Sequence, residues 1–141
     1  MQQRLIYVMD PMCSWCWGLA PLIDAIFQAH PDVPVHLVAG SLRPHLQAPL
    51  DNASRQALAA HWQSVAALSG QPFSDPQALP EPLIYNVRPA SQALIVARAL
   101  DVERLWPFVR AMQQAFFAEC MDITRPAVLL EIAAANGYDP V

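Results

Sequence analysis

The chain has 141 residues, of which 55% are hydrophobic, which is enough for one hydrophobic core and too little for two ordinary domains. Eight Lys and Arg residues stand against twelve Asp and Glu residues, giving a net charge of −4 that is unsuited to nucleic acid or an anionic membrane. No stretch approaches the roughly 18 apolar residues of a membrane span, and residues 5–9 are too few for a signal-peptide core. We therefore expect a soluble, cytoplasmic protein that binds neither nucleic acid nor membranes.

The first forty residues have the pattern of a strand, a helix and a second strand. Residues 4–9 are apolar, β-branched and aromatic and stop at Asp10-Pro11, which predicts a buried strand. Residues 33–39 form a second β-branched stretch. Between them apolar residues recur at helical spacing, namely Leu19, Leu22, Ile23, Ile26 and Phe27. Such a unit implies two parallel strands with the helix packed on one face of the sheet.

The remainder of the chain is predicted to be helical. Expected helices cover residues 53–68, 89–100 and about 102–120, and a last helix is capped by Thr124 and ended by Gly137. Residues 72–82 are rich in proline and predict a loop. Because two strands rarely form a stable sheet alone, we expect the sequence to be a fragment or its remaining strands to come from elsewhere.

A C-x-x-C motif, Cys13-Ser14-Trp15-Cys16, lies where the first predicted strand ends and the first predicted helix begins. Disulfide exchange requires an accessible thiolate and a second thiol close enough to resolve the mixed disulfide. A helix N-terminus favours a thiolate at Cys13, while Cys16, one turn inside, is placed to resolve. No Lys, Arg or His lies near the pair in the sequence, and Asp10 would oppose a thiolate, so the pKa of Cys13 is left open.

Aromatic and proline residues flank the dithiol. Trp15 and Pro11 are the predicted substrate contacts, since an aromatic rim excludes water and offers apolar surface to a partner. Trp17 is better explained by core packing. Pro21 falls inside the predicted helix, where it removes a backbone hydrogen bond and should kink the axis.

The sequence YVMDPMCSWCWG at residues 7–18, followed by Pro21, resembles the DsbA-like branch of the thioredoxin superfamily, especially its FrnE-like and bacterial disulfide-isomerase-like members. YNVRPA at residues 85–90 and AFFAECMDIT at residues 115–124 resemble the helical domain that this family inserts into its thioredoxin fold. The resemblance implies an α/β fold with a thioredoxin-like βαβ unit in residues 1–45 and an inserted α-helical domain in residues 46–141. The late strands of the sheet are then missing from this chain. It also implies that Cys13 is the nucleophile and Cys16 the resolving residue.

The sequence departs from the family pattern in two places. The family places a cis-proline loop opposite the dithiol, before a late strand, and this sequence ends at Val141 before any such element. The dipeptide between the cysteines is Ser14-Trp15 rather than Pro-His, so strong oxidising power is not expected.

The predicted function is that of a thiol–disulfide oxidoreductase or isomerase acting on protein or small-molecule thiols and disulfides. No cofactor is expected beyond the redox-active disulfide, with glutathione as an optional co-substrate. The oligomeric state stays open, with a dimer among the alternatives. A glutathione-dependent transferase or isomerase of the same fold and an inactive truncated binding module are the alternative functions.

A zinc site is a further alternative. Tetrahedral zinc wants four nitrogen or sulfur ligands, and a second C-x-x-C is absent. The residues that could complete a site show no ligand spacing, and they are Cys120, His30, His36, His45 and His61. By default Cys120 is an inert, half-buried helical residue and the histidines are surface or helix-cap residues.

Overall fold

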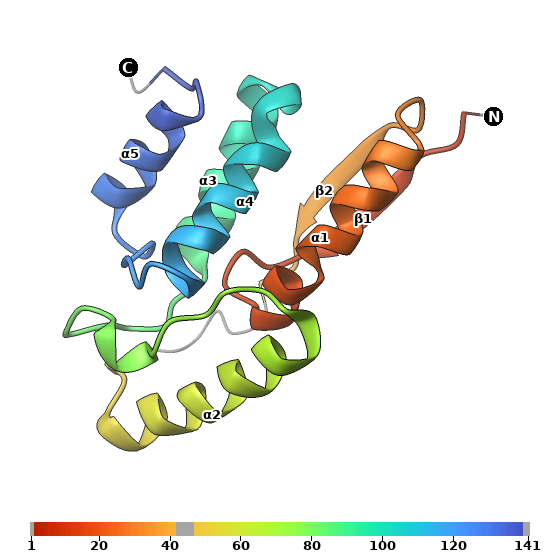
Figure 1. Cartoon of the computed structure of the whole chain (residues 1–141). Coiled ribbons are helices and arrows are strands. Elements are labelled where there is room, and N and C mark those ends of the chain that lie inside the picture. Colours follow the sequence, from red (N-terminus) through yellow and green to blue (C-terminus); the bar gives the residue numbers. More distant parts are fainter. Residues whose placement is uncertain (1, 42–46, 140–141) are drawn as a thin grey trace.

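The computed structural model describes residues 2–41 and 47–139 and arranges them as a two-stranded sheet with helices beside it (Figure 1). The predicted α/β class and the order of strand, helix, strand and further helices are confirmed. The expected domain boundary at residues 45 and 46 lies outside the described residues. In chain order the strands and α-helices are β1 (Leu5–Met9), α1 (Ser14–Ala29), β2 (Val35–Ala39), α2 (Asn52–Ser69), α3 (Arg88–Leu100), α4 (Leu105–Phe117) and α5 (Pro126–Ala135), with 3-10 turns at Pro76–Ala78 and Val102–Arg104.

The two strands are parallel, as predicted, and pair in register from Leu5 opposite Val35. Because strand side chains alternate between faces, Tyr7 and Met9 point toward the helices while Ile6 and Val8 point the other way. Ile6 and Val8 are 51% and 61% exposed. The prediction that this strand is buried is therefore wrong for its outer face, which lies open in the described part of the chain.

A cluster of aromatic rings joins α2 to α4. Trp62 is 1% exposed and meets three phenylalanine rings in tilted or edge-on contacts, with centroids 5.1 to 5.8 Å away. Figure 1 shows the result, with α2 crossing beneath the ends of α3 and α4. The rings that Trp62 meets are Phe73, Phe116 and Phe117.

A buried arginine fixes the proline-rich loop. Arg55 of α2 is 1% exposed, and its guanidinium donates to the carbonyl oxygens of Pro76, Leu79 and Pro80 at 2.9, 2.8 and 3.1 Å. A planar guanidinium can serve several acceptors at once, which a buried lysine could not do with the same geometry. The loop therefore follows a defined path from α2 toward α3.

Two helix ends differ from the sequence-based expectation. Cys120 lies beyond the end of α4, with a left-handed φ of 52°, so it is not the helical residue expected; its side chain is buried and donates to the Asp75 carbonyl at 3.3 Å. Thr124 does not cap the last helix, because its hydroxyl donates to the Asp122 carboxylate and the helix begins instead at Pro126. Proline suits this first position since it has no N–H to satisfy.

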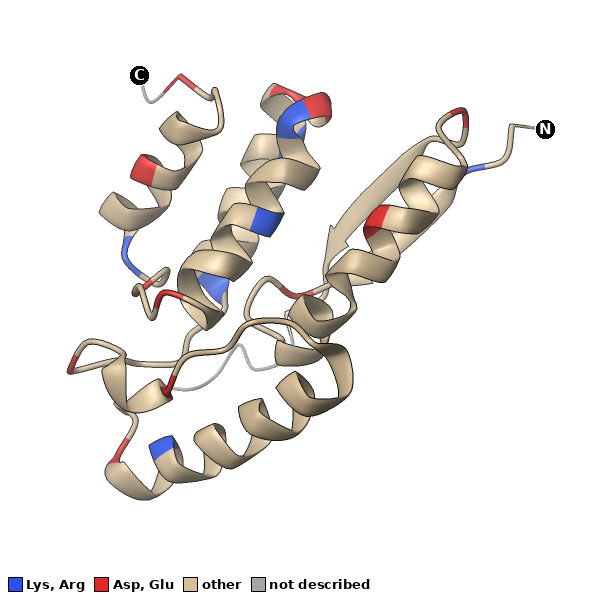
Figure 2. Ribbon diagram, viewed as in Figure 1, with Lys and Arg blue, Asp and Glu red and all other residues tan. Residues whose placement is uncertain are grey.

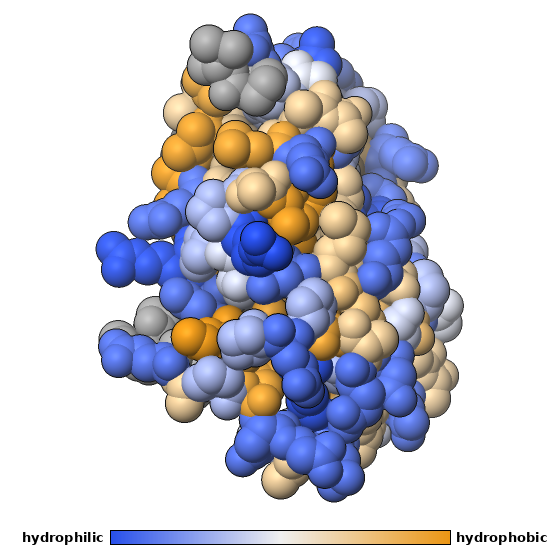
Figure 3. All heavy atoms as spheres, turned by 90° about the vertical axis from the view of Figure 1, so that its left-hand side faces the viewer, coloured by the Kyte–Doolittle hydropathy of each residue, from blue (hydrophilic) through white to orange (hydrophobic). Residues whose placement is uncertain are grey.

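The described surface carries few and scattered charges (Figure 2). Seen from the α5 side, apolar patches interrupt a mostly hydrophilic surface (Figure 3). Val96, Leu100 and Leu130 are all more than half exposed and line a hollow between α3 and α5. None of the helices in the described ranges has the length and apolar character of a membrane span.

Candidate active site

A tight turn places Cys13 at the start of α1. The Cys13 N–H donates to the Asp10 carbonyl at 3.1 Å, and the buried Asp10 carboxylate accepts the Met12 N–H at 2.8 Å. The Tyr85 hydroxyl, from the segment before α3, donates to the Met12 carbonyl. Cys13 is thereby the N-cap residue of α1, with φ −87° and ψ 120°, beside helix N–H groups that have no intrahelical acceptor. The predicted place of the dithiol at a strand-to-helix junction is confirmed.

The two cysteines differ in how tightly each binds a proton. The hydrogen bond from the Cys16 side chain is the main cause that lowers the pKa of Cys13 to about 6. The backbone N–H groups of Cys16 and Trp15 lower it further, whereas partial burial and the Asp10 carboxylate raise it. The same sulfur–sulfur hydrogen bond, followed by burial, raises the pKa of Cys16 far above that of an ordinary thiol. Near neutral pH the pair therefore holds a thiolate at Cys13 and a thiol at Cys16.

Tyr7 of β1 lies beside the second cysteine. Burial is the main cause that raises the pKa of the Tyr7 phenol, and Cys16 adds to the effect through charge and a hydrogen bond. The hydrogen bond from Tyr7 in turn lowers the pKa of Cys16, against the larger effects that raise it. An edge-on contact with Trp106, with ring centroids 6.4 Å apart, fixes the Tyr7 ring. The sequence does not single out Tyr7, because strand alternation predicts which face of the sheet its side chain takes but not which group its hydroxyl reaches.

The flanking residues of the dithiol have different environments. Trp15 is 41% exposed, so its ring is accessible to a partner, and its role as a substrate contact stays a prediction. Trp17 is buried and its Nε1 donates to the Pro72 carbonyl at 2.9 Å, which confirms core packing. Pro11 is buried, so the structure gives no support to its predicted contact with substrate.

The first turns of α1 are joined closely to α2 and to the residues that follow it. A Cβ atom added at Gly18 would lie 2.9 Å from Val65 Cγ1, so the absence of a side chain at Gly18 allows the two helices to approach. Pro21 has no N–H, which leaves the Trp17 carbonyl without its partner in the helix. Gln71 fills that gap, since its Nε2 donates to the Trp17 carbonyl at 3.0 Å.

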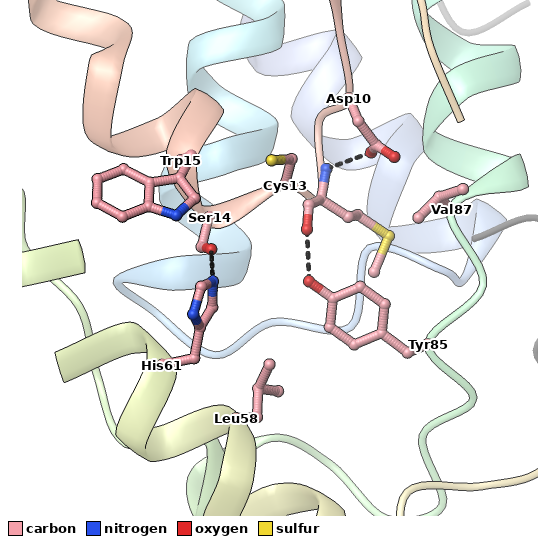
Figure 4. A pocket seen from close by; sticks show the side chains of 9 residues that line it. Asp10, Cys13, Ser14, Trp15, Leu58, His61, Tyr85 and Val87 are labelled. Atoms are coloured by element: carbon pink, nitrogen blue, oxygen red, sulfur yellow. Dashed lines mark hydrogen bonds between the residues drawn. The ribbon is translucent and has the colours of Figure 1, made fainter. Parts of the chain in front are cut away.

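A cavity of about 220 Å³ opens beside Cys13 (Figure 4). The turn that carries the dithiol forms one wall of this cavity. Leu58 and His61 of α2 lie across from that wall, and Tyr85 and Val87 close the side toward α3. Residues far apart in the sequence therefore line one cavity with Cys13.

His61 makes direct contact with the dipeptide between the cysteines. Its Nε2 lies 2.8 Å from the Ser14 hydroxyl oxygen, and its ring meets the Trp15 ring edge-on with centroids 6.5 Å apart. His61 is exposed, as expected for a surface histidine, but the sequence did not predict its contact with Ser14 and Trp15. Forty-seven residues separate His61 from Ser14, and no local pattern in the sequence connects them. His30, by contrast, ends α1 as expected.

The described residues offer no set of ligands for a zinc site. Across residues 2–41 and 47–139, no three His, Cys, Asp or Glu side chains gather closely enough to hold a metal ion. His45, one of the candidates, lies outside the described residues. Cys13, Cys16 and Cys120 are all free thiols.

Comparison with known proteins places this arrangement in a family. The model of the DSBA-like thioredoxin domain matches residues 4–141. The chain belongs to the DSBA-like thioredoxin family. Its βαβ unit, with the dithiol at the start of α1, is the part of the fold that the sequence resemblance implied, so that expectation is confirmed.

Solved structures of DsbA-like oxidoreductases resemble this chain closely. A crystal structure assigned as a protein disulfide isomerase from Nitrosomonas europaea has 34% identity and a TM-score of 0.86, covering 99% of this chain and 67% of its own. The cytosolic disulfide reductase DsbM from Pseudomonas aeruginosa, solved with GSH, has 28% identity and a TM-score of 0.80. The match covers 95% of this chain and 65% of the DsbM chain.

A curated relative has a different description. The ClpXP adapter protein SpxH of Bacillus subtilis (strain 168) is 28% identical over 137 residues, which is 92% of this chain and 43% of that protein. The chain thus spans less than half the length of this curated relative and about two thirds of the solved structures it matches.

Proposed function

We propose that the chain is a thiol–disulfide oxidoreductase in which Cys13 is the nucleophile and Cys16 the resolving thiol. The observation that carries this proposal is the opposite pKa behaviour of the two sulfurs at a helix N-terminus. The pKa of Cys13 is lowered to about 6 while the pKa of Cys16 is raised. An attacking thiolate beside a protonated partner is the arrangement that two-step exchange requires.

The exchange follows from these protonation states. The Cys13 thiolate attacks one sulfur of a substrate disulfide, a mixed disulfide forms, and the other substrate sulfur leaves as a thiolate. Cys16 loses its proton to that leaving group or to solvent and attacks the Cys13 sulfur, which releases the second substrate thiolate. The substrate has then gained two electrons, and the chain holds a Cys13–Cys16 disulfide. Two equivalents of a thiol reduce that disulfide again, and the reverse sequence oxidises a dithiol substrate.

Tyr7 assists the second step. Cys16 can attack only as a thiolate, and burial opposes the charge that then develops on its sulfur. A hydrogen bond from the Tyr7 hydroxyl stabilises that charge. The hydroxyl keeps its own proton, because the pKa of Tyr7 is raised.

We propose a low-molecular-weight thiol such as glutathione as one substrate or reductant. The cavity beside Cys13, of about 220 Å³, is a place for the part of such a molecule next to its sulfur. A similar structure, the disulfide reductase DsbM, was solved with GSH. Protein thiols and disulfides are the alternative substrates, and the exposed Trp15 ring is the surface that would meet them. The description of DsbM as cytosolic also supports our expectation of a cytoplasmic location.

A second candidate function is protein binding without turnover. It is favoured by the similarity to SpxH, whose name describes an adapter. Binding of that kind should persist in Cys13→Ser, whereas exchange should not.

Trapping of mixed disulfides tests the proposed roles. Cys16→Ser should accumulate a mixed disulfide with a model disulfide such as oxidised glutathione, because no resolving thiol can release it. Cys13→Ser should form none at Cys16 on the same timescale, since burial, which remains when the Cys13 sulfur is removed, still raises the pKa of that thiol and limits access to it. Cys120→Ser is the matched control and should exchange like the wild type, because its thiol is buried and its pKa is raised by burial. Wild-type exchange rates in Cys13→Ser would refute the assignment.

A further inference from the structure

We propose that His61 is a positioning residue of the dithiol, contributed by α2, which holds in place Ser14 and Trp15, the two residues between the cysteines. This inference rests on the proposed exchange function and deepens it, because it assigns part of the redox balance and of the substrate contact to the helical segment.

The contact with Ser14 is the first ground for this role. Ser14 is 6% exposed, and a buried hydroxyl requires a hydrogen-bond partner. His61 Nε2, at 2.8 Å, supplies it. A hydroxyl can both donate and accept, so this bond is compatible with either tautomer of the imidazole and with its protonated form. His61 can therefore hold Ser14 over the whole range of pH in which exchange takes place.

The contact with Trp15 is the second ground. The Trp15 ring is 41% exposed and lines the cavity beside Cys13, where a free ring would sample several orientations. The T-shaped contact with the His61 ring, with centroids 6.5 Å apart, limits that freedom (Figure 4). A substrate then meets an ordered wall, and less entropy is lost when it binds.

The packing of α2 against α1 directs His61 to this position. His61 and Val65 are four residues apart and so share one face of α2. Val65 is fully buried and lies against Gly18, one turn after Ser14 on α1. The close approach at Gly18 thus sets the distance between the His61 ring and the dipeptide.

Holding the dipeptide also affects the reactive sulfur. The backbone N–H groups of Trp15 and Cys16, which follow Ser14, favour the charged form of Cys13, and Asp10 opposes it. When Ser14 is held, these two N–H groups keep their direction toward the sulfur. Loss of His61 should therefore weaken the thiolate and favour the disulfide, which shifts the redox equilibrium toward a more reducing protein.

Substitutions at His61 and Ser14, made in the full chain, test the proposal. The equilibrium constant with glutathione should change by about three- to tenfold in His61→Ala, the effect of losing one hydrogen bond. Ser14→Ala should change it in the same direction, and the double variant should add little, because both remove one interaction. His36→Ala is the matched control, since His36 is an exposed histidine on β2, and it should behave like the wild type.

Two further measurements separate positioning from a merely structural role. His61→Gln can still share a hydrogen bond with Ser14 and should restore part of the equilibrium constant that His61→Ala loses. The KM for a model disulfide should rise in His61→Ala because the Trp15 ring is released. Thermal melting identifies any unfolded variant, and His61→Gln is used for the comparison if His61→Ala does not fold.

The titration of Cys13 distinguishes this proposal from the function on which it rests. Thiolate absorbance reports the pKa of Cys13 without any turnover, and His61→Ala should raise that pKa. If no variant exchanges disulfides but this shift is present, the proposed function fails and the positioning role stands. If His61→Ala matches His36→Ala in titration, redox equilibrium and KM, or if the effects of His61→Ala and Ser14→Ala simply add, the positioning role is wrong.

Discussion

Asp10 has two opposing effects at the dithiol. Its carboxylate accepts the Met12 N–H and so shapes the turn that brings Cys13 to the helix start. The same negative charge raises the pKa of Cys13 and works against the thiolate. The hydrogen bond from Cys16 and the backbone N–H groups outweigh that charge, because the pKa of Cys13 is lowered on balance. The carboxylate of Asp10 thus stabilises the turn and at the same time destabilises the Cys13 thiolate.

Asp10→Asn should separate these two effects. An asparagine oxygen can still accept the Met12 N–H, while the charge is removed. We expect the pKa of Cys13 to fall further, so the rate of Cys13 alkylation, which decreases as pH falls through about 6 in the wild type, should decrease at a lower pH. Asp32→Asn, at an exposed loop residue, is the control. An unchanged or higher midpoint in Asp10→Asn would show that the carboxylate charge does not reach the thiolate.

At the scale of elements, the joint between α1 and α2 determines the site. Gly18 allows the helices to approach, and Gln71 satisfies the carbonyl that Pro21 leaves free. Trp17 is held from the same side, by the Pro72 carbonyl. The first turn of α1, which carries both cysteines, is therefore fixed by α2 and the loop after it rather than by the sheet alone.

Gly18→Ala tests this joint. At an uncrowded position in a helix, replacement of glycine by alanine stabilises a protein by roughly 0.5–1 kcal/mol. Here the new methyl group would lie 2.9 Å from Val65 Cγ1 and 3.2 Å from Ser69 Cβ. We expect a net loss of about 1–3 kcal/mol in the free energy of unfolding, measured in urea, because buried side chains must shift.

Two companion variants make the result at Gly18 specific. Val65→Ala, combined with Gly18→Ala, should cost less than the sum of the two single changes, since it removes the atom that clashes. Gln28→Ala, at an exposed residue of α1, should have little effect. A more stable Gly18→Ala protein would mean that the helices are less tightly joined than the structure indicates.

The whole molecule is packed unevenly. The aromatic cluster around Trp62 is closed between α2 and α4, while Ile6 and Val8 expose the outer face of the sheet. Cys13 lies between these two regions, where β1 ends and α1 begins. The chain therefore brings its dithiol to a junction of sheet and helical segment, and both contribute residues to the site.

The sequence predicted those features that depend on short stretches of chain. Apolar spacing predicted the helix that is α1, and cap and stop residues predicted α2 and α3 to within about two residues of their observed bounds. The C-x-x-C motif with its neighbours predicted a thiolate at a helix start. Two expectations failed for different reasons. Thr124 donates to Asp122 instead of capping the last helix, which is a competing local interaction. Val8 is exposed because no other element covers the outer face of the sheet in the described part of the chain.

Contacts between distant segments could not be predicted in this way. His61 meets Ser14 across 47 residues and Tyr85 meets Met12 across 73, so each pair exists only once the chain has folded. Tyr7 is nearer in sequence, but its approach to Cys16 depends on how α1 packs on β1. The position of the dithiol at the helix start was therefore predictable, whereas the contacts that His61, Tyr85 and Tyr7 make around it were not.

The redox equilibrium of the Cys13–Cys16 pair shows whether these two thiols form an exchanging dithiol. The protein is equilibrated in graded glutathione buffers, the free thiols are alkylated, and mass spectrometry locates each modified cysteine. We predict a reversible intramolecular disulfide with a potential between about −270 and −120 mV, the range of dithiols that exchange catalytically. Cys120 should remain a thiol throughout. If both cysteines stay reduced in every buffer, or if either forms a disulfide only with Cys120, the proposed exchange through a Cys13–Cys16 disulfide is wrong.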